Sequence, residues 1–295
     1  MTNTTIPISL APRISLETTQ NIPRIIHQTF KTAKVPEGIF GAVSTWIDKN
    51  PEYAYEFYDD ARMIDFIRNF DCTGFSFTNE QLNEAFDLIK PGAGKADIFR
   101  YCVLYVYGGI YSDIDSECLV PLKDFINKTD DIVVIINFWR VNVVHHVLSQ
   151  WWMAYVKTHP VIKHTLELVV KSVLTRDPIN CFEDTDNIMG LLEKFTGPAV
   201  YNKVFLDAMK IKIEKYRLER FNNISETVMQ MNLLGSKSNV RFVHYDNHND
   251  YHNDSDPVSS GDSIPKYVRF KYSDYPNDLH KLGLKSWSDD GQDVF

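Results

Sequence analysis

Positive charge and long apolar runs are both scarce in this sequence. Its 31 Lys and Arg residues against 39 Asp and Glu residues give a net charge of −8, so no general electrostatic attraction to nucleic acid or to an anionic membrane is expected. No stretch approaches the roughly 20 apolar residues of a transmembrane helix, and the polar N-terminus lacks the basic and apolar regions of a signal peptide. We therefore expect no nucleic-acid partner and no transmembrane segment.

Cysteine is scarce as well, with 4 residues in a chain of 295. No two of them form a Cys-x-x-Cys pair, so we expect free buried thiols rather than a disulfide framework or a zinc site. Free thiols and the missing secretory signal favour a cytoplasmic protein, of a bacterium or of a virus in its host's cytosol. The Golgi lumen would fit only if a membrane anchor is absent from this sequence.

The chain is long enough and apolar enough, at 44% hydrophobic residues, to bury a full core. We expect one domain over residues 21–295. Residues 1–20 are polar, rich in Thr and Ser and interrupted by Pro7 and Pro12, which predicts a flexible leader. A polar, turn-rich stretch at about residues 246–263 predicts a flexible loop.

Strand and helix patterns alternate in the first third of the chain. IPRIIHQTF, from Ile22, has the branched apolar run of a buried strand, and a helical pattern through Trp46 then stops at Asn50-Pro51. YAYEFYD follows as a strand, and DARMIDFIRNF as a short amphipathic helix. We therefore expect the α/β class, with a mostly parallel central sheet flanked by helices and a ligand site at the carboxyl ends of the strands. Further along, DIVVIINFW predicts a core strand, and helices are expected over roughly residues 145–210.

Residues 93–107 form a helical pattern that is apolar on nearly every side. Such a helix is buried in the protein. Asp97 and Arg100 lie three residues apart on one face, and a buried carboxylate and guanidinium must pair with each other or bind something. Gly108-Gly109 then ends the helix.

Two carboxylates follow this helix at the end of the apolar strand GIYS. Asp113 and Asp115 place two hard oxygen ligands at the edge of a sheet, where a divalent cation can hold a phosphate-bearing substrate. A phosphatase of the haloacid dehalogenase type also uses Asp-x-Asp after a strand. Such an enzyme would have Thr or Val two residues after the second Asp, whereas Ser116-Glu117-Cys118 follows here.

Five segments resemble, in order, the DXD sugar-binding glycosyltransferases of family 32, which include yeast-type initiating α-1,6-mannosyltransferases, inositol-phosphoceramide mannosyltransferases and capsular transferases. These segments are IPRIIHQTFKT, NPEYAYEFYDD, KADIFRYCVLYVYGGIYSDID, the TGP of Thr196 to Pro198, and Ser286-Trp287. The resemblance spans most of residues 22–287. It implies a single-domain GT-A fold and a transfer that retains anomeric configuration with Mn²⁺ or Mg²⁺ as cofactor.

The resemblance also implies roles for individual residues. Asp115 would be the direct metal ligand and Asp113 would be shared between the metal and the donor, while Asp97 and Arg100 would grip hydroxyls of the donor sugar. His280 resembles the family's histidine that completes the metal shell. The implied donor-binding residues are His27, Gln28, Asp97, Arg100, Tyr111, Asp113, Asn142, Ser286 and Trp287, and the implied metal ligands are Asp113, Asp115 and His280.

The resulting hypothesis is a metal-dependent, retaining glycosyltransferase. It would move a hexosyl group from a nucleotide diphosphate sugar, a UDP-hexose or GDP-mannose, to a hydroxyl of a glycan, lipid or protein. Two alternatives remain open. One is a catalytically silent protein that binds nucleotide sugars or carbohydrates, and the other is an Asp-x-Asp phosphatase.

Overall fold

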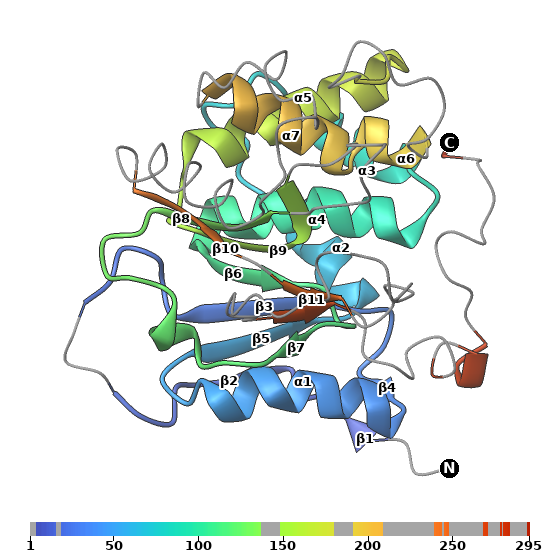
Figure 1. Cartoon of the computed structure of the whole chain (residues 1–295). Coiled ribbons are helices and arrows are strands. Elements are labelled where there is room, and N and C mark those ends of the chain that lie inside the picture. Colours follow the sequence, from blue (N-terminus) through green and yellow to red (C-terminus); the bar gives the residue numbers. More distant parts are fainter. Residues whose placement is uncertain are drawn as a thin grey trace, which may run out of the picture.

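A computed structural model describes residues 4–15, 19–136, 148–179, 191–208, 239–243, 245–247, 268–270, 278, 280–283 and 294–295. Its centre is a seven-stranded sheet of order β10-β8-β9-β6-β3-β5-β2. Helix α1 covers one face of this sheet, and α2, α4, α5 and α7 lie on the other (Figure 1). The sheet strands are β2 (Ser9–Leu10), β3 (Ile25–Thr29), β5 (Ala54–Tyr58), β6 (Gly109–Ser112), β8 (Ile132–Ile136), β9 (Leu148–Tyr155) and β10 (Val240–Val243).

Most strands of the sheet run in one direction. β3 pairs parallel with β5 and β6, and β8 pairs parallel with β10. β9 runs antiparallel to both β6 and β8, and β2 runs antiparallel to β5. The expected α/β class, with a mostly parallel sheet between helices, is therefore confirmed. The GT-A assignment and the single domain over residues 21–295 stay predictions.

The helices form where the sequence offers caps and apolar faces. α1 buries Ile39, Val43 and Trp46 along one stripe, and α3 begins with a capping box between Thr78 and Gln81. None of the described helices is both long and apolar enough to cross a membrane. The helices are α1 (Glu37–Lys49), α2 (Asp60–Arg68), α3 (Asn79–Leu88), α4 (Gly92–Tyr107), α5 (Pro160–Thr175), α6 (Leu191–Phe195) and α7 (Pro198–Ala208).

Helix α4 and strand β6 meet at a turn that only glycine suits. Gly108 and Gly109 have φ angles of +64° and +89°, in the left-handed region that favours glycine. A Cβ on Gly109 would lie 2.5 Å from the carbonyl oxygen of Ile25. The two glycines therefore end the helix as predicted and let β6 approach β3 closely.

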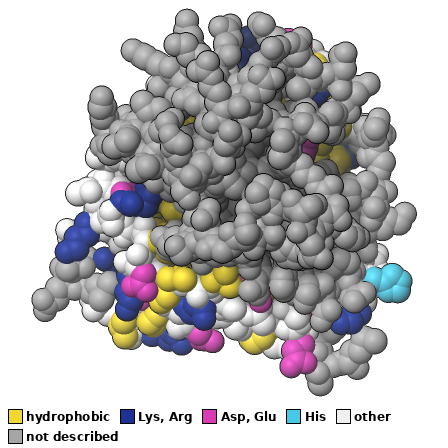
Figure 2. Space-filling model, viewed as in Figure 1, with side chains coloured by type: hydrophobic (Ala, Val, Ile, Leu, Met, Phe, Trp, Pro, Cys, Tyr) yellow, Lys and Arg dark blue, Asp and Glu magenta, His cyan; other side chains and the backbone are white. Residues whose placement is uncertain are grey.

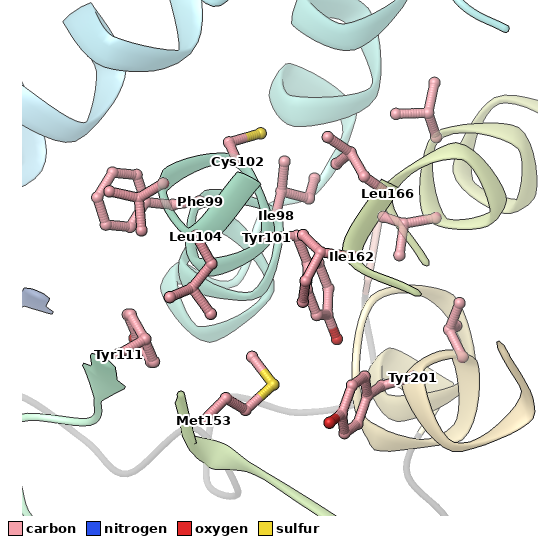
Figure 3. Close-up of a cluster of buried hydrophobic side chains, with 14 of the residues drawn as sticks. Ile98, Phe99, Tyr101, Cys102, Leu104, Tyr111, Met153, Ile162, Leu166 and Tyr201 are labelled. Atoms are coloured by element: carbon pink, nitrogen blue, oxygen red, sulfur yellow. The ribbon is translucent and has the colours of Figure 1, made fainter. Parts of the chain in front are cut away.

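The sheet separates two apolar cores. We call them the α4 core, centred on Ile98, Tyr101, Tyr111 and Met153, and the α1 core, centred on Trp46, Ile110, Ile114 and Trp152. Consecutive residues of β6 serve opposite cores, as expected for a strand buried on both faces. Figure 3 shows side chains of the α4 core, with Ile98, Tyr101 and Leu104 of α4 facing Met153 of β9, Ile162 and Leu166 of α5 and Tyr201 of α7.

The leader is more ordered than its composition suggested. Strand β1 (Thr4–Thr5) pairs with β4 (Lys34–Val35), and β2 extends the main sheet beside β5. Ile6 between them is completely buried, so the expectation of a flexible leader is wrong for this part. An apolar side chain inside a polar stretch is enough to dock it.

Helices α5, α6 and α7 lie within residues 145–210 as expected, but β9 in the same range is a strand. The strand carries Trp151 and Trp152 side by side in the α1 core, whereas Met153 and Tyr155 serve the α4 core. An irregular register opposite Val134 and Ile136 accompanies this change, as at a β-bulge. The bulge hides the period-two pattern by which a strand is recognised in sequence.

The remaining expectations concern a core strand, a loop and the cysteines. Within DIVVIINFW, residues Ile132–Ile136 form β8 as predicted, and the last three residues of the segment lie outside the described residues. Short strands β7 (Glu117–Cys118), β11 (Tyr245–Asn247) and β12 (Val268–Phe270) form a separate sheet; the predicted loop at 246–263 thus begins inside β11, and its remainder lies outside the described residues. Cys72, Cys102 and Cys118 are buried free thiols, as expected.

Candidate active site

The Asp113–Ser116 turn leaves the carboxyl end of β6 with its backbone fixed. The N–H of Asp113 donates to the Trp151 carbonyl at 2.8 Å. The carbonyl of Asp113 accepts from Ser116 Oγ at 2.6 Å and from Gln28 Nε2 at 3.2 Å. The turn is therefore tied to β9 on one side and to β3 on the other, as expected for a site at the carboxyl ends of the strands.

Residues on the α1 side of the sheet also hold the Asp113–Ser116 turn. Trp46 Nε1 donates to the Ser116 carbonyl at 2.9 Å, and the hydroxyls of Ser112 and Ser116 lie 2.5 Å apart. Ile114, between the two carboxylates, is buried in the α1 core. All the groups involved on this side are neutral.

The α4 core presents a buried cation to Asp113. Arg100 Nη2 lies 3.1 Å from Asp113 Oδ1 and 3.2 Å from Asp97 Oδ1. Of the two expected possibilities, the helix residues Asp97 and Arg100 therefore pair with each other, and Arg100 also contacts the DXD pair. Arg100 Nη1 also donates to the Gln150 carbonyl at 2.8 Å. The guanidinium lies over the Tyr111 ring, 4.7 Å from its centroid, and the Tyr111 hydroxyl donates to Asp113 Oδ1 at 2.9 Å.

Asp97 is the most enclosed carboxylate of the group. Gln150 Nε2 donates to its Oδ1 and Thr196 Oγ1 to its Oδ2, both at 2.8 Å. Burial raises the pKa of Asp97 to about 6, while Arg100 and the Thr196 hydroxyl act in the opposite direction. Asp97 is thus a buried acid whose charge depends on its neighbours.

Exposure separates the members of this network. The Asp113 side chain is 28% exposed, against 5% for Arg100 and 7% for Asp97. Of these three side chains, Asp113 is therefore the one that can reach a ligand most readily. Asp115 follows within the same turn and is largely buried.

The donor groups of this turn suit a hard divalent cation. Mg²⁺ and Mn²⁺ prefer carboxylate oxygens, and Mg²⁺ commonly takes one or two from the protein and completes its shell with water and phosphate oxygens. Within the described ranges, no group of three or more His, Cys, Asp and Glu side chains is placed to hold a metal. Asp113 and Asp115 supply two carboxylates in one turn, the number that Mg²⁺ commonly takes from a protein.

His27 and Gln28 point to opposite faces of β3. Gln28 is completely buried and also accepts from the Tyr55 hydroxyl at 3.0 Å, so it anchors the DXD turn. His27 Nε2 lies 3.1 Å from the Gly108 carbonyl, and burial lowers the pKa of His27 to about 4. The neutral ring therefore ties β3 to the junction of α4 and β6, and its role in donor binding stays a prediction.

The C-terminal candidates are not joined to this network by the described contacts. His280 is exposed, and its carbonyl accepts from the N–H of Gly283 at 2.9 Å. Asn142, Ser286 and Trp287 lie outside the described residues. Their roles in the metal shell and in donor binding stay predictions.

On the face shown in Figure 2, basic, acidic and hydrophobic side chains are interspersed over α1 along its lower part. The described part of this face carries no patch of one charge, in keeping with the modest net charge of −8.

Residues 36–132 match the family model described as the glycosyltransferase sugar-binding region containing the DXD motif. This region of the chain is similar to the DXD glycosyltransferases. The matched region contains Asp97, Arg100, Asp113 and Asp115, which the structure brings together at one edge of the sheet.

Relatives of this chain are named for sugar transfer. Inositol phosphoceramide mannosyltransferase 3 of Schizosaccharomyces pombe is 34% identical over 139 residues, covering 47% of this chain and 35% of that protein. The putative glycosyltransferase HOC1 of Saccharomyces cerevisiae is 24% identical over 233 residues, covering 72% of this chain and 57% of that protein. The chain thus spans between about a third and about three fifths of the length of these relatives.

A solved structure is also similar to this chain. The PaToxG glycosyltransferase aligns with a TM-score of 0.48 and 18% identity, covering 74% of this chain and 79% of that chain.

Two residues of the network were not singled out from the sequence. Gln150 lies on β9, in a segment expected to be helical, and a lone glutamine there carries no signal. Thr196 belongs to the TGP segment that contributed to the family resemblance, but nothing in its spacing pointed to Asp97, 99 residues earlier.

Proposed function

We propose that this protein transfers a hexosyl group from a nucleotide diphosphate sugar to an acceptor hydroxyl, with Mn²⁺ or Mg²⁺ and with retention of anomeric configuration. One observation carries the proposal. In the matched DXD region, Arg100 and Tyr111 hold Asp113 with part of its carboxylate exposed at the carboxyl edge of the sheet. Such an oriented carboxylate, with a second one two residues further along, would hold a divalent cation.

In this proposal Asp113 and Asp115 hold the cation. When bound, a divalent ion acts as a Lewis acid that stabilises the charge developing on the departing diphosphate. The protein's own part is to keep the two carboxylates in place before the donor arrives. Gln28 and Ser116 fix the Asp113 carbonyl, and Arg100 and Tyr111 fix its carboxylate, which avoids reorganisation during the reaction.

Asp97 and Arg100 remain our candidates for contacts with the donor sugar. A carboxylate offers about four acceptor sites, and Gln150, Thr196 and Arg100 already engage Asp97. About one site is left for a sugar hydroxyl. Arg100 likewise directs most of its N–H groups at protein oxygens, so any sugar contact here would be single rather than multiple.

The relatives favour one donor among those considered. Several of them are named mannosyltransferases, which makes a mannosyl group, carried by GDP, the first donor to test. Two of these names include inositol phosphoceramide, so an inositol-bearing sphingolipid is the first acceptor class to test. Glycan and protein hydroxyls follow.

The test is release of nucleoside diphosphate from GDP-mannose, UDP-glucose, UDP-galactose and UDP-N-acetylglucosamine, each with Mn²⁺ or Mg²⁺. Asp115→Asn is expected to lower turnover by about 10²-fold or more, because one transition-state-stabilising group is lost. Asp124→Asn, at an exposed position of the short helix Leu122–Asp124, is the matched control and should leave turnover unchanged.

Three results would contradict the proposal. Undiminished release of nucleoside diphosphate by a folded Asp115→Asn variant would show that the proposed cation site takes no part in the reaction. Donor binding without turnover would favour a catalytically silent binding protein. Release of inorganic phosphate, abolished by Asp113→Asn and indifferent to nucleotide sugars, would favour the phosphatase.

A further inference from the structure

We propose that Thr196 and Gln150 are positioning residues that hold the Asp97 carboxylate against Arg100 and, through Arg100, fix the Asp113 carboxylate of the DXD pair. The inference rests on the proposed function for what Asp113 does. It adds two residues to the site, one from β9 and one from the turn between α6 and α7, neither of which touches Asp113 through the contacts described above.

Each oxygen of Asp97 has a neutral donor of its own. Gln150 Nε2 and Thr196 Oγ1 lie 2.8 Å from Oδ1 and Oδ2 respectively. Both residues are buried, Thr196 completely and Gln150 to 7% exposure. A buried carboxylate oxygen that loses its donor is destabilised by its full desolvation penalty. The two donors therefore stabilise one orientation of Asp97 in its charged form.

The orientation of the Gln150 amide is itself determined by its surroundings. Its Oε1 accepts from the Tyr101 hydroxyl at 2.5 Å, and its Nε2 faces Asp97. A flipped amide would place its oxygen against the Asp97 carboxylate, which cannot donate while it is charged. Tyr101 and Asp97 thus select the orientation in which Gln150 donates to Asp97.

Thr196 has a second possible acceptor. Its hydroxyl lies 3.3 Å from the Leu192 carbonyl as well as 2.8 Å from Asp97. A hydroxyl has one hydrogen, and the shorter, charge-assisted bond to the carboxylate is the stronger of the two. The Leu192 carbonyl of α6 therefore does not displace Asp97 as the main acceptor of the Thr196 hydroxyl.

Arg100 transmits the position of Asp97 to the DXD pair. One nitrogen, Nη2, lies 3.2 Å from Asp97 and 3.1 Å from Asp113, so the two carboxylates share it. A shift of Asp97 moves the Arg100 guanidinium. This movement changes the distance between Arg100 and Asp113 and so the strength of their ion pair. Because Asp113 is the most exposed of the three, this change is felt by a bound cation or donor.

The test compares Thr196→Val with Thr196→Ser and with a matched control, Thr165→Val. Thr165 is also completely buried, but its hydroxyl donates to Val161 within α5. We expect Thr196→Val to lower the rate of nucleoside diphosphate release and the affinity for Mn²⁺ by about tenfold each, the loss of one hydrogen bond to a charged group. Thr196→Ser should stay within about twofold of wild type, since it keeps the hydroxyl, and Thr165→Val should leave both quantities unchanged.

The decisive measurement repeats Thr196→Val in an Asp97→Ala background, which leaves the hydroxyl no side-chain acceptor at position 97. If Thr196 acts through Asp97, the second substitution adds no further loss. An equal loss in both backgrounds, or a loss in Thr165→Val as large as in Thr196→Val, overturns the inference. If Thr196→Val does not fold, Gln150→Leu is compared in the same two backgrounds, because it removes the other neutral donor to Asp97.

The proposed function and the inference fail separately. If the wild-type protein binds Mn²⁺ but releases no nucleoside diphosphate, the proposed function is wrong, and the Mn²⁺ affinities of the same variants still decide the inference. If it releases nucleoside diphosphate and the Thr196 and Asp97 effects simply add, only the inference is wrong. A wild-type protein with neither Mn²⁺ binding nor release overturns both.

Discussion

The two faces of the central sheet hold one turn by different physical means. On the α4 face, Arg100 bridges Asp97 and Asp113 through charged contacts. On the α1 face, Trp46 binds the Ser116 carbonyl through a neutral hydrogen bond. Buried charges contribute little net stability against well-packed apolar residues, so the α4 face is arranged for the orientation of a carboxylate, and the α1 face for the backbone that carries it.

The largest expected effect comes from removing the Arg100 guanidinium, which Asp97 and Asp113 share. Arg100→Met leaves Asp97 and Asp113 buried or half-buried beside each other without a counter-charge, which should lower the free energy of unfolding by about 3–5 kcal/mol. Urea denaturation at pH 7.5 measures it. The control is Arg68→Met, which breaks the exposed pair with Asp87 and should change stability by less than about 1 kcal/mol. Equal losses in the two variants would mean that the buried Arg100 contributes no more to stability than an exposed arginine, which would contradict the charged character given to the α4 face.

The titration of Asp97 on the α4 face should make the free energy of unfolding depend on pH. The folded pKa of Asp97 is about 6 against an ordinary value of 3.8, so between these values the folded protein keeps a proton that the unfolded chain has released. Relative to Asp97→Asn, wild-type stability should therefore fall as pH rises from about 4 to 6, by up to about 3 kcal/mol. Unfolding measured at half-unit steps tests this, and parallel curves for the two proteins would contradict it.

The smallest effect is expected on the α1 face. Trp46→Phe removes the donor to the Ser116 carbonyl and should lower the free energy of unfolding by about 1 kcal/mol beyond the change in size, at every pH. Trp152→Phe is the matched control, because Trp152 is buried in the same core and its Nε1 has no hydrogen-bond partner among the described residues. A pH-dependent difference between these two variants would mean that charge matters on this face too.

The charged face was the easier of the two to anticipate from sequence. Asp97 and Arg100 stand out because charged residues are rare in an otherwise apolar helix, and Gly108-Gly109 marks where that helix ends. Gln150 and Thr196 could not be found in the same way, because neutral polar residues occur in every part of a chain. The bulge in β9 and the burial of Ile6 depend on tertiary packing, which overrides local pattern.

The distance along the chain between Asp97 and its partners has a consequence for synthesis. Arg100 and Asp113 are 13 residues apart, whereas Thr196 lies 99 residues beyond Asp97. Long-range contacts form late because a long loop must first be closed. On the ribosome, the DXD turn and its arginine can meet while α7 is still being translated. Asp97 receives its last donor only after the TGP segment has emerged, so this hydrogen-bond network forms from its local contacts outward and is completed by its most distant residue.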